Sequence, residues 1–244
     1  MYINDIHILC YFFIGLLGAF VGQYLDFANT RLENHESLIC KEFFREYLPN
    51  IKINFKNIMI MALIYIALLY YNGLSIKLIE FLILSPMFFS VFVIDYRKQI
   101  IPDRITLLIF EVGIIFTFIE GFSSINLLID KVLGMIAGAG AFLIITLIGG
   151  LIAGKEAMGF GDVKLMGALG LVFGFTKIII VAVLAFLLAA IISIILMITR
   201  IKKSNEYIPF GPFIILAVFM VLFIPSNLLI YALIKIFTLG TYRE

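Results

Sequence analysis

Two aspartates in this chain of 244 residues have neighbours that suit acid–base chemistry. Asp162 follows two glycines in "MGFGDVKLMGALG" (158–170), and Asp95 ends an apolar run in "VFVIDYRKQIIPDRIT" (91–106). Taken singly, each has an ordinary explanation, as the cap of a helix that starts at Val163 or as the first polar residue after a span. Two carboxylates that meet at low dielectric cannot both ionise easily, and such a pair can activate a water molecule. We therefore predict that Asp95 and Asp162 are catalytic, although spacing alone does not show that they meet.

Three residues around Asp162 are predicted to support it. Gly159 and Gly161 would let backbone or substrate approach where a Cβ would obstruct, and Lys164 follows two residues later. Glu156, six residues before Asp162, either tunes the site or marks the membrane interface.

Two further acids lie near Asp95 in sequence. Asp103 competes with Asp95 for the partner role, although capping of the helix after Pro102 explains it well. Glu111 lies about 10 Å along that helix and is expected to face the bundle interior, with no assigned role.

The composition predicts an all-α, polytopic transmembrane helical bundle in the lipid bilayer. The chain is 63% hydrophobic and 14% charged, whereas a soluble domain is about a quarter charged. Apolar runs long enough to cross a bilayer recur along it, and a net charge of +2 is too small to suggest nucleic acid as a partner. The expected spans are 6–27, 57–73, 77–95, 104–121, 130–153, 163–174, 177–199 and 209–237.

Basic residues gather in the loops 28–56, 96–104 and 200–206. Cytoplasmic loops carry an excess of Lys and Arg, so we expect these loops in the cytoplasm and the N-terminus outside. This orientation requires 163–199 to cross twice with a hinge at Gly174, which gives about eight spans. The patterns "GMIAG" (134–138) and "GLVFG" (170–174) predict close helix packing.

Three blocks resemble the type IV prepilin leader peptidases, which are intramembrane aspartic proteases of the GxGD type. They are "IDYRKQIIPDRIT" (94–106), "KEAMGFGDVKLMGALGLVFG" (155–174) and "IPFGPFIILA" (208–217), in the family's order. The resemblance implies that Asp95 and Asp162 are catalytic, whereas Asp103 falls on a "PD" that is not usually the catalytic position. It also implies cleavage of prepilins or pseudopilins of type IV pili or type II secretion, after a glycine, at the cytoplasmic side of the inner membrane.

The N-terminal stretch "GQYLDFANTRLENHESL" (22–38) is similar to the family's stretch, with Arg31 and Glu36 among the matches. Many members also methylate the new N-terminus with S-adenosylmethionine, and we expect Arg31 and Glu36 to bear on this activity if it is retained. The family's next loop carries two CxxC pairs suited to zinc, but here only Cys40 remains. We expect no zinc or other metal, and no cofactor for proteolysis.

These observations divide the chain into N-terminal spans with a reduced loop (1–95) and a peptidase bundle (77–244), which overlap at the third span. A proton- or cation-coupled transporter is the alternative, because intramembrane acids suit ion transport too. Transporters often show paired halves, and no internal repeat is visible here. The sequence leaves open the substrate pathway, the oligomeric state and the resting distance between the two aspartates.

Overall fold

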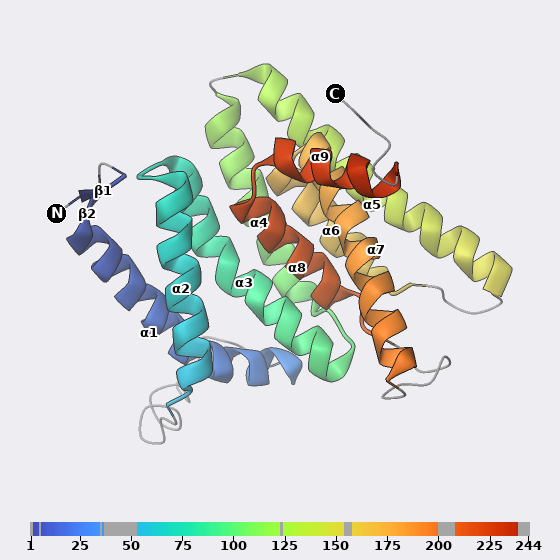
Figure 1. Cartoon of the computed structure of the whole chain (residues 1–244), viewed down its shortest axis with the longest axis horizontal. Coiled ribbons are helices and arrows are strands. Elements are labelled where there is room, and N and C mark those ends of the chain that lie inside the picture. Colours follow the sequence, from blue (N-terminus) through green and yellow to red (C-terminus); the bar gives the residue numbers. More distant parts are fainter. Residues whose placement is uncertain are drawn as a thin grey trace. The chain divides into compact units, whose positions relative to one another are not determined.

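The computed structural model describes residues 2–4, 6–34, 36, 53–122, 124–153, 158–199 and 208–238. These residues are almost wholly helical, which confirms the predicted fold class. One short hairpin, in which β1 (Tyr2–Ile3) pairs antiparallel with β2 (Ile6–His7), precedes the first helix (Figure 1). The chain divides into two compact units, Met1–Lys98 and Gln99–Glu244.

The first unit consists of α1 (Ile8–Glu33), α2 (Phe55–Asn72) and α3 (Ile76–Lys98). Glycines on one face of α1 let it pack tightly against α2. A Cβ at Gly18 would lie 2.8 Å from the carbonyl oxygen of Met61. Small residues allow this kind of close approach between membrane helices.

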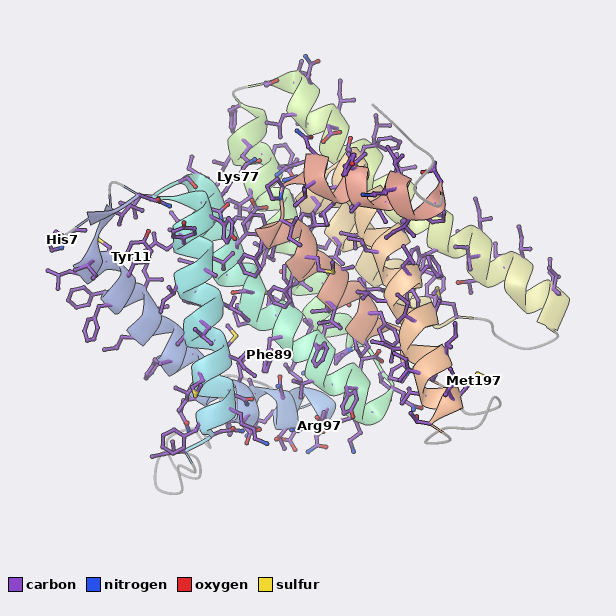
Figure 2. The ribbon with its side chains drawn as sticks, in the orientation of Figure 1. His7, Tyr11, Lys77, Phe89, Arg97 and Met197 are labelled. Carbon is purple, nitrogen blue, oxygen red and sulfur yellow. The ribbon has the colours of Figure 1, made fainter. Side chains whose placement is uncertain are left out.

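A buried cluster joins the three helices of the first unit. Leu25 of α1, Met61 and Tyr65 of α2, and Phe89 of α3 meet there. Figure 2 labels Phe89 on α3. The hydroxyl of Tyr65 donates a hydrogen bond of 2.8 Å to the carbonyl oxygen of Leu82. This cluster fixes the middle of α3, the helix that carries Asp95 in its last turns.

The second unit contains the remaining helices of the described residues. They are α4 (Asp103–Gly121), α5 (Ile125–Ala153), α6 (Phe160–Phe173), α7 (Phe175–Ile198), α8 (Gly211–Phe223) and α9 (Ser226–Phe237). Helix α6 packs against α5 and α4, and α7 packs against α5 and α8. Almost all of α6 is buried, so the helix that carries Asp162 is the central element of this unit.

The crossing of α5 and α6 brings backbone against backbone. A Cβ at Gly134 would meet the carbonyl oxygen of Gly170, one at Gly138 would meet that of Met166, and one at Gly170 would meet that of Gly134. The two glycine patterns thus allow the close approach that the sequence predicts.

The break between α6 and α7 is at Gly174, where the sequence predicts the hinge. Gly174 has a φ of 80°, which a residue with a Cβ rarely adopts. One carboxylate oxygen of Asp130 occupies the space that a Cβ at Gly174 would fill. The other accepts a hydrogen bond of 3.4 Å from the backbone N–H of Phe175, which caps the first turn of α7.

Five of the described helices, α1, α2, α3, α5 and α7, are long and apolar enough to cross a membrane. Helix α6 has 14 residues and rises about 21 Å, less than the roughly 30 Å of a hydrocarbon core. The predicted span 209–237 is two helices, because the chain breaks at Ile224 and Pro225. The count of eight spans and the outside N-terminus therefore remain predictions.

The side chain of Glu111 does not point where the sequence predicts. The sequence places it toward the bundle interior, but its side chain is exposed on α4. The helix phase explains the difference, since Leu107 and Ile115, one turn before and one turn after, are also exposed.

Candidate active site

Asp162 lies in the first turn of α6 and is only 4% exposed. Helix α6 begins at Phe160 with Gly159 as its N-cap residue. Asp162 is thus the third helical residue, and the expectation that it caps a helix starting at Val163 is wrong. Its backbone N–H donates a bond of 3.1 Å to the carbonyl oxygen of Gly159. A carboxylate in this turn interacts favourably with the positive end of the helix dipole.

Gly161 permits a close approach beside Asp162. A Cβ there would lie 3.2 Å from the side chain of Ile101, which is tighter than ordinary van der Waals contact. Gly159 has extended backbone angles that suit an N-cap, without a side-chain cap bond. The two glycines therefore serve the start of α6 and its contact with the segment before α4.

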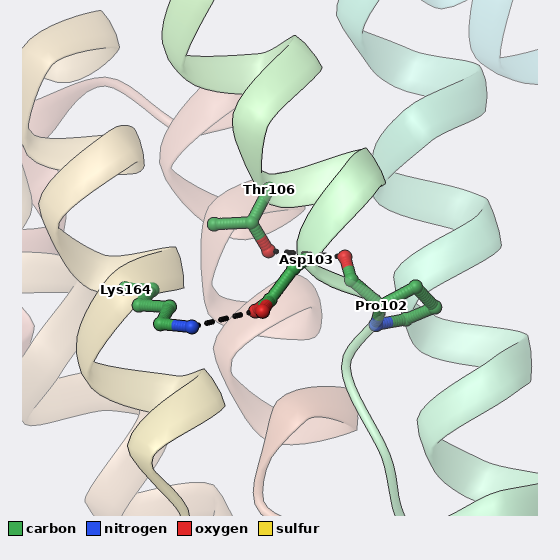
Figure 3. A network of polar contacts seen from close by, with 4 residues as sticks. All are labelled: Pro102, Asp103, Thr106 and Lys164. Carbon is green, nitrogen blue, oxygen red and sulfur yellow. Dashed lines mark hydrogen bonds and ion pairs between the residues drawn. The ribbon is translucent and has the colours of Figure 1, made fainter. Parts of the chain in front are cut away.

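Asp103 and Lys164 join the first turns of α4 and α6. Lys164 Nζ donates to Asp103 Oδ1 at 2.8 Å (Figure 3). Lys164 Nζ also lies 5.6 Å from the ring centroid of Phe160. Asp103 was expected to cap α4, but the N-cap residue is Pro102 and Asp103 is the first helical residue, with its carboxylate turned to Lys164. This exposed pair links the helix of Asp162 to its neighbour.

Asp95 lies near the C-terminal end of α3 in the first unit and is 4% exposed. Two residues later, Arg97 NH1 is 3.8 Å from Glu33 Oε1 at the end of α1; Arg97 is labelled in Figure 2. Acids at membrane depth are costly and mark functional sites by default. Asp95 and Asp162 share this property, Asp95 in the first unit and Asp162 in the second.

The two residues predicted for methyl transfer are brought together. Arg31 NH2 lies 3.3 Å from Glu36 Oε2, and the backbone N–H of Glu36 donates to the carbonyl oxygen of Arg31 at 2.9 Å. The guanidinium of Arg31 also lies over the ring of Phe27, 5.5 Å from its centroid. These contacts all lie at the C-terminal end of α1.

The predictions for Glu156 and Cys40 concern residues that lie outside the part of the chain that the structure describes. Within the described ranges, no group of three His, Cys, Asp or Glu side chains is placed to hold a metal ion.

Sequence reasoning missed a set of charges at the other end of α4, α5 and α6. Lys131 Nζ is 2.8 Å from Glu120 Oε2, and both side chains are largely buried. Asp130, next to Lys131, caps α7. The sequence held one signal for the position of Asp130: Asp130, Gly134 and Gly138 are spaced four residues apart, which places them on one face of a helix.

Comparison with known proteins gives one matched region, which contains the residues predicted for proteolysis. The model of the type IV leader peptidase family matches residues 82–194, which include Asp95, Asp103 and Asp162. The chain is thus similar to this family over residues 82–194, slightly less than half of its length. The N-terminal stretch 22–38 and the block 208–217 lie outside the match, so the family match is narrower than the resemblance in sequence.

Curated relatives agree with the family match. The chain is 35% identical over 136 residues to a prepilin leader peptidase/N-methyltransferase of Aeromonas hydrophila, covering 56% of this chain and 46% of the relative. It is 32% identical over 124 residues to one from Pseudomonas aeruginosa, covering 51% of this chain and 42% of the relative. The chain therefore spans about half the length of the relatives it matches. No significant match to a solved structure was found.

Proposed function

We propose that this chain is a prepilin leader peptidase, an intramembrane aspartic endopeptidase that uses Asp95 and Asp162. The observation that carries the proposal is that the matched region contains two acidic residues, Asp95 and Asp162, that are each only 4% exposed. The names of the relatives support the same reaction class.

The proposed chemistry is hydrolysis with divided roles for the two carboxyl groups. One carboxylate accepts a proton from water, whose oxygen attacks the carbonyl carbon of the scissile peptide. The other carboxyl group donates its proton to the carbonyl oxygen. When the C–N bond breaks, the carboxyl group that took the proton from water gives it to the leaving amine, and the other carboxylate recovers a proton from a hydroxyl of the tetrahedral diol. The pair again holds one proton between two acids, and the diol has become the new carboxyl group.

The proposed substrates are prepilins or pseudopilins, cut after a glycine just before their apolar helix. The proposed side is the cytoplasm, because the basic loops fall on the side where Asp95 and Asp162 lie in the predicted topology. Lys164 and Asp103 are positioning residues in this scheme, since their ion pair joins the first turn of α6 to α4.

The test is cleavage of a prepilin-like substrate by the purified full chain in liposomes. We expect Asp95→Asn and Asp162→Asn each to abolish cleavage while the protein remains folded in the membrane. The matched control is Glu111→Gln, which removes an exposed acid from α4 in the matched region and should leave most cleavage. Normal cleavage by Asp162→Asn, or an equal loss with Glu111→Gln, would refute the assignment.

A second candidate activity is N-methylation of the new N-terminus, favoured by a polar pocket in the first unit. The pocket measures about 590 Å³, with Asp26, Lys56 and Arg97 among its lining residues. S-adenosylmethionine carries an ammonium group, which suits the carboxylate of Asp26, and a carboxylate group, which suits the cations of Lys56 and Arg97. When bound, that cofactor would supply the methyl group.

Mass spectrometry of the mature substrate's N-terminus tests this activity. We expect a gain of one methyl group when S-adenosylmethionine is present, and reduced binding of S-adenosylmethionine by Asp26→Ala in equilibrium dialysis. An unmodified amine together with unchanged binding would remove methyl transfer from the proposal and leave proteolysis standing.

A further inference from the structure

An open groove of about 540 Å³ runs between α4, α5 and α6 in the second unit. Its volume lies within the roughly 300–1,000 Å³ of ligand pockets. Its walls are mainly apolar, and the side chains that form them include Leu107, Phe110, Met135, Ala139 and Val163. Such walls suit an apolar chain and offer little to a polar molecule along their length.

One end of the groove is charged. Asp103, Arg104 and Lys164 line it, and the exposed pair Lys164–Asp103 bridges the first turns of α6 and α4 there. Arg104 is exposed on the same turn of α4. Among the described residues that line this end of the groove, two are cations and one is a carboxylate, so their summed charge is positive. A positive end beside an apolar trough complements a molecule with an anionic head and an apolar tail.

The charged end of the groove favours a lipid over an apolar helix as the occupant. An apolar helix would bring nothing to match the cations at that end, whereas a phospholipid places its phosphate there and its acyl chain against the apolar walls.

We propose that this groove binds an anionic phospholipid, with one acyl chain between α4, α5 and α6 and the phosphate at Arg104 and Lys164. Arg forms strong charge-assisted hydrogen bonds with phosphate oxygens. The bound phosphate bridges α4 and α6 next to the first turn that carries Asp162. Neither Asp95 nor Asp162 lines the groove, although the positioning pair Lys164–Asp103 does. The lipid site therefore stands whether or not the two buried aspartates are catalytic.

Lipid retention by the purified full chain tests the site. The protein is washed in detergent to remove bulk lipid and titrated with phosphatidylglycerol or phosphatidylcholine, and bound lipid is counted by native mass spectrometry. We expect tighter binding of phosphatidylglycerol, and about tenfold weaker binding by Arg104→Gln, in line with the loss of a charged hydrogen bond.

Two further variants complete the test. Ala139→Leu fills the groove without changing charge and should weaken binding of both lipids. Lys235→Gln removes an exposed cation from α9, away from the groove, and should change nothing. Equal binding by wild type, Arg104→Gln and Ala139→Leu would overturn the proposal. So would a co-purified membrane protein that Ala139→Leu displaces, because the groove would then be a helix-docking surface.

Discussion

The two ends of α6 are held in opposite ways. At its C-terminal end the backbone touches that of α5 through Gly134 and Gly170, and Asp130 fills the space beside Gly174. At its N-terminal end an exposed ion pair, Lys164–Asp103, joins it to α4, and an open groove begins beside that pair. One helix thus has a densely packed end and an accessible end.

The difference separates the task of fixing α6 from the task of giving ligands access to the neighbourhood of Asp162, which is itself buried. Packing density resists movement, because interiors without voids transmit strain and tolerate few volume changes. The packed end therefore sets where α6 lies, while ligands can reach the neighbourhood of Asp162 at the other end. If this comparison is right, variants at the packed end should cost much stability and variants at the accessible end should cost little.

The largest expected effect is at the buried pair Glu120–Lys131. Lys131→Met leaves the Glu120 carboxylate largely buried without its cation, and breaking such a pair costs about 3 kcal/mol or more. Thermal unfolding in detergent should show a clear loss. The double variant Glu120→Leu with Lys131→Met should recover most of it, and a double variant as unstable as the single one would contradict the explanation.

The next effect is at the helix crossing. Gly170→Ala forces a Cβ against the backbone of Gly134, and overpacking of this kind costs about 1–3 kcal/mol. The matched control is Gly140→Ala on α5, where nothing lies within 4 Å of the added Cβ. That change should be neutral or stabilise by about 0.5–1 kcal/mol through helix propensity. Equal stability of the two variants would break the comparison.

A smaller effect is expected at the cap of α7. Asp130→Ala removes the acceptor for the N–H of Phe175, and loss of a helix cap costs about 1 kcal/mol. Asp130→Asn keeps an acceptor and should recover part of the loss. Hydrogen exchange at the start of α7 would report the change locally, and unaltered exchange in Asp130→Ala would show that the cap is dispensable.

The smallest stability effect is at the accessible end. The pair Lys164–Asp103 is solvent-exposed, with the two side chains 43% and 72% exposed, and such pairs contribute at most about 1 kcal/mol. Lys164→Gln should therefore unfold within about 1 kcal/mol of wild type while slowing cleavage of a prepilin-like substrate. A stability loss as large as that of Gly170→Ala would mean that this end also fixes α6.

Much of the helix pattern could be read from the sequence, because each apolar run has a clear start and stop. The expected spans 57–73 and 177–199 correspond to α2 and α7 within about two residues at each end. The hinge at Gly174 and the close packing of 134–138 and 170–174 were also predictable, since glycine spacing carries them. The length of the first helix was underestimated, because α1 continues past the expected apolar span 6–27 to Glu33.

The tertiary contacts could not be read in this way. Asp130 contacts the α6–α7 turn from 44 residues away in sequence at Gly174, and Lys164 reaches Asp103 across 61 residues. Each aspartate expected to cap its own helix instead lies inside the first turn, because α6 already begins at Phe160 and α4 begins at Asp103 itself. The catalytic pair itself stays a prediction, supported by burial and by the family match.

The length of α6 has a consequence for access to Asp162. From the turn at Gly174, α6 rises about 21 Å over 14 residues, whereas α7 rises about 36 Å over 24 residues. Helix α6 is therefore about 15 Å shorter than α7. A helix terminus within the bilayer depth leaves backbone N–H groups that need hydrogen-bond partners. A hydrated inlet from the membrane surface would satisfy them and would also deliver the water that peptide hydrolysis consumes.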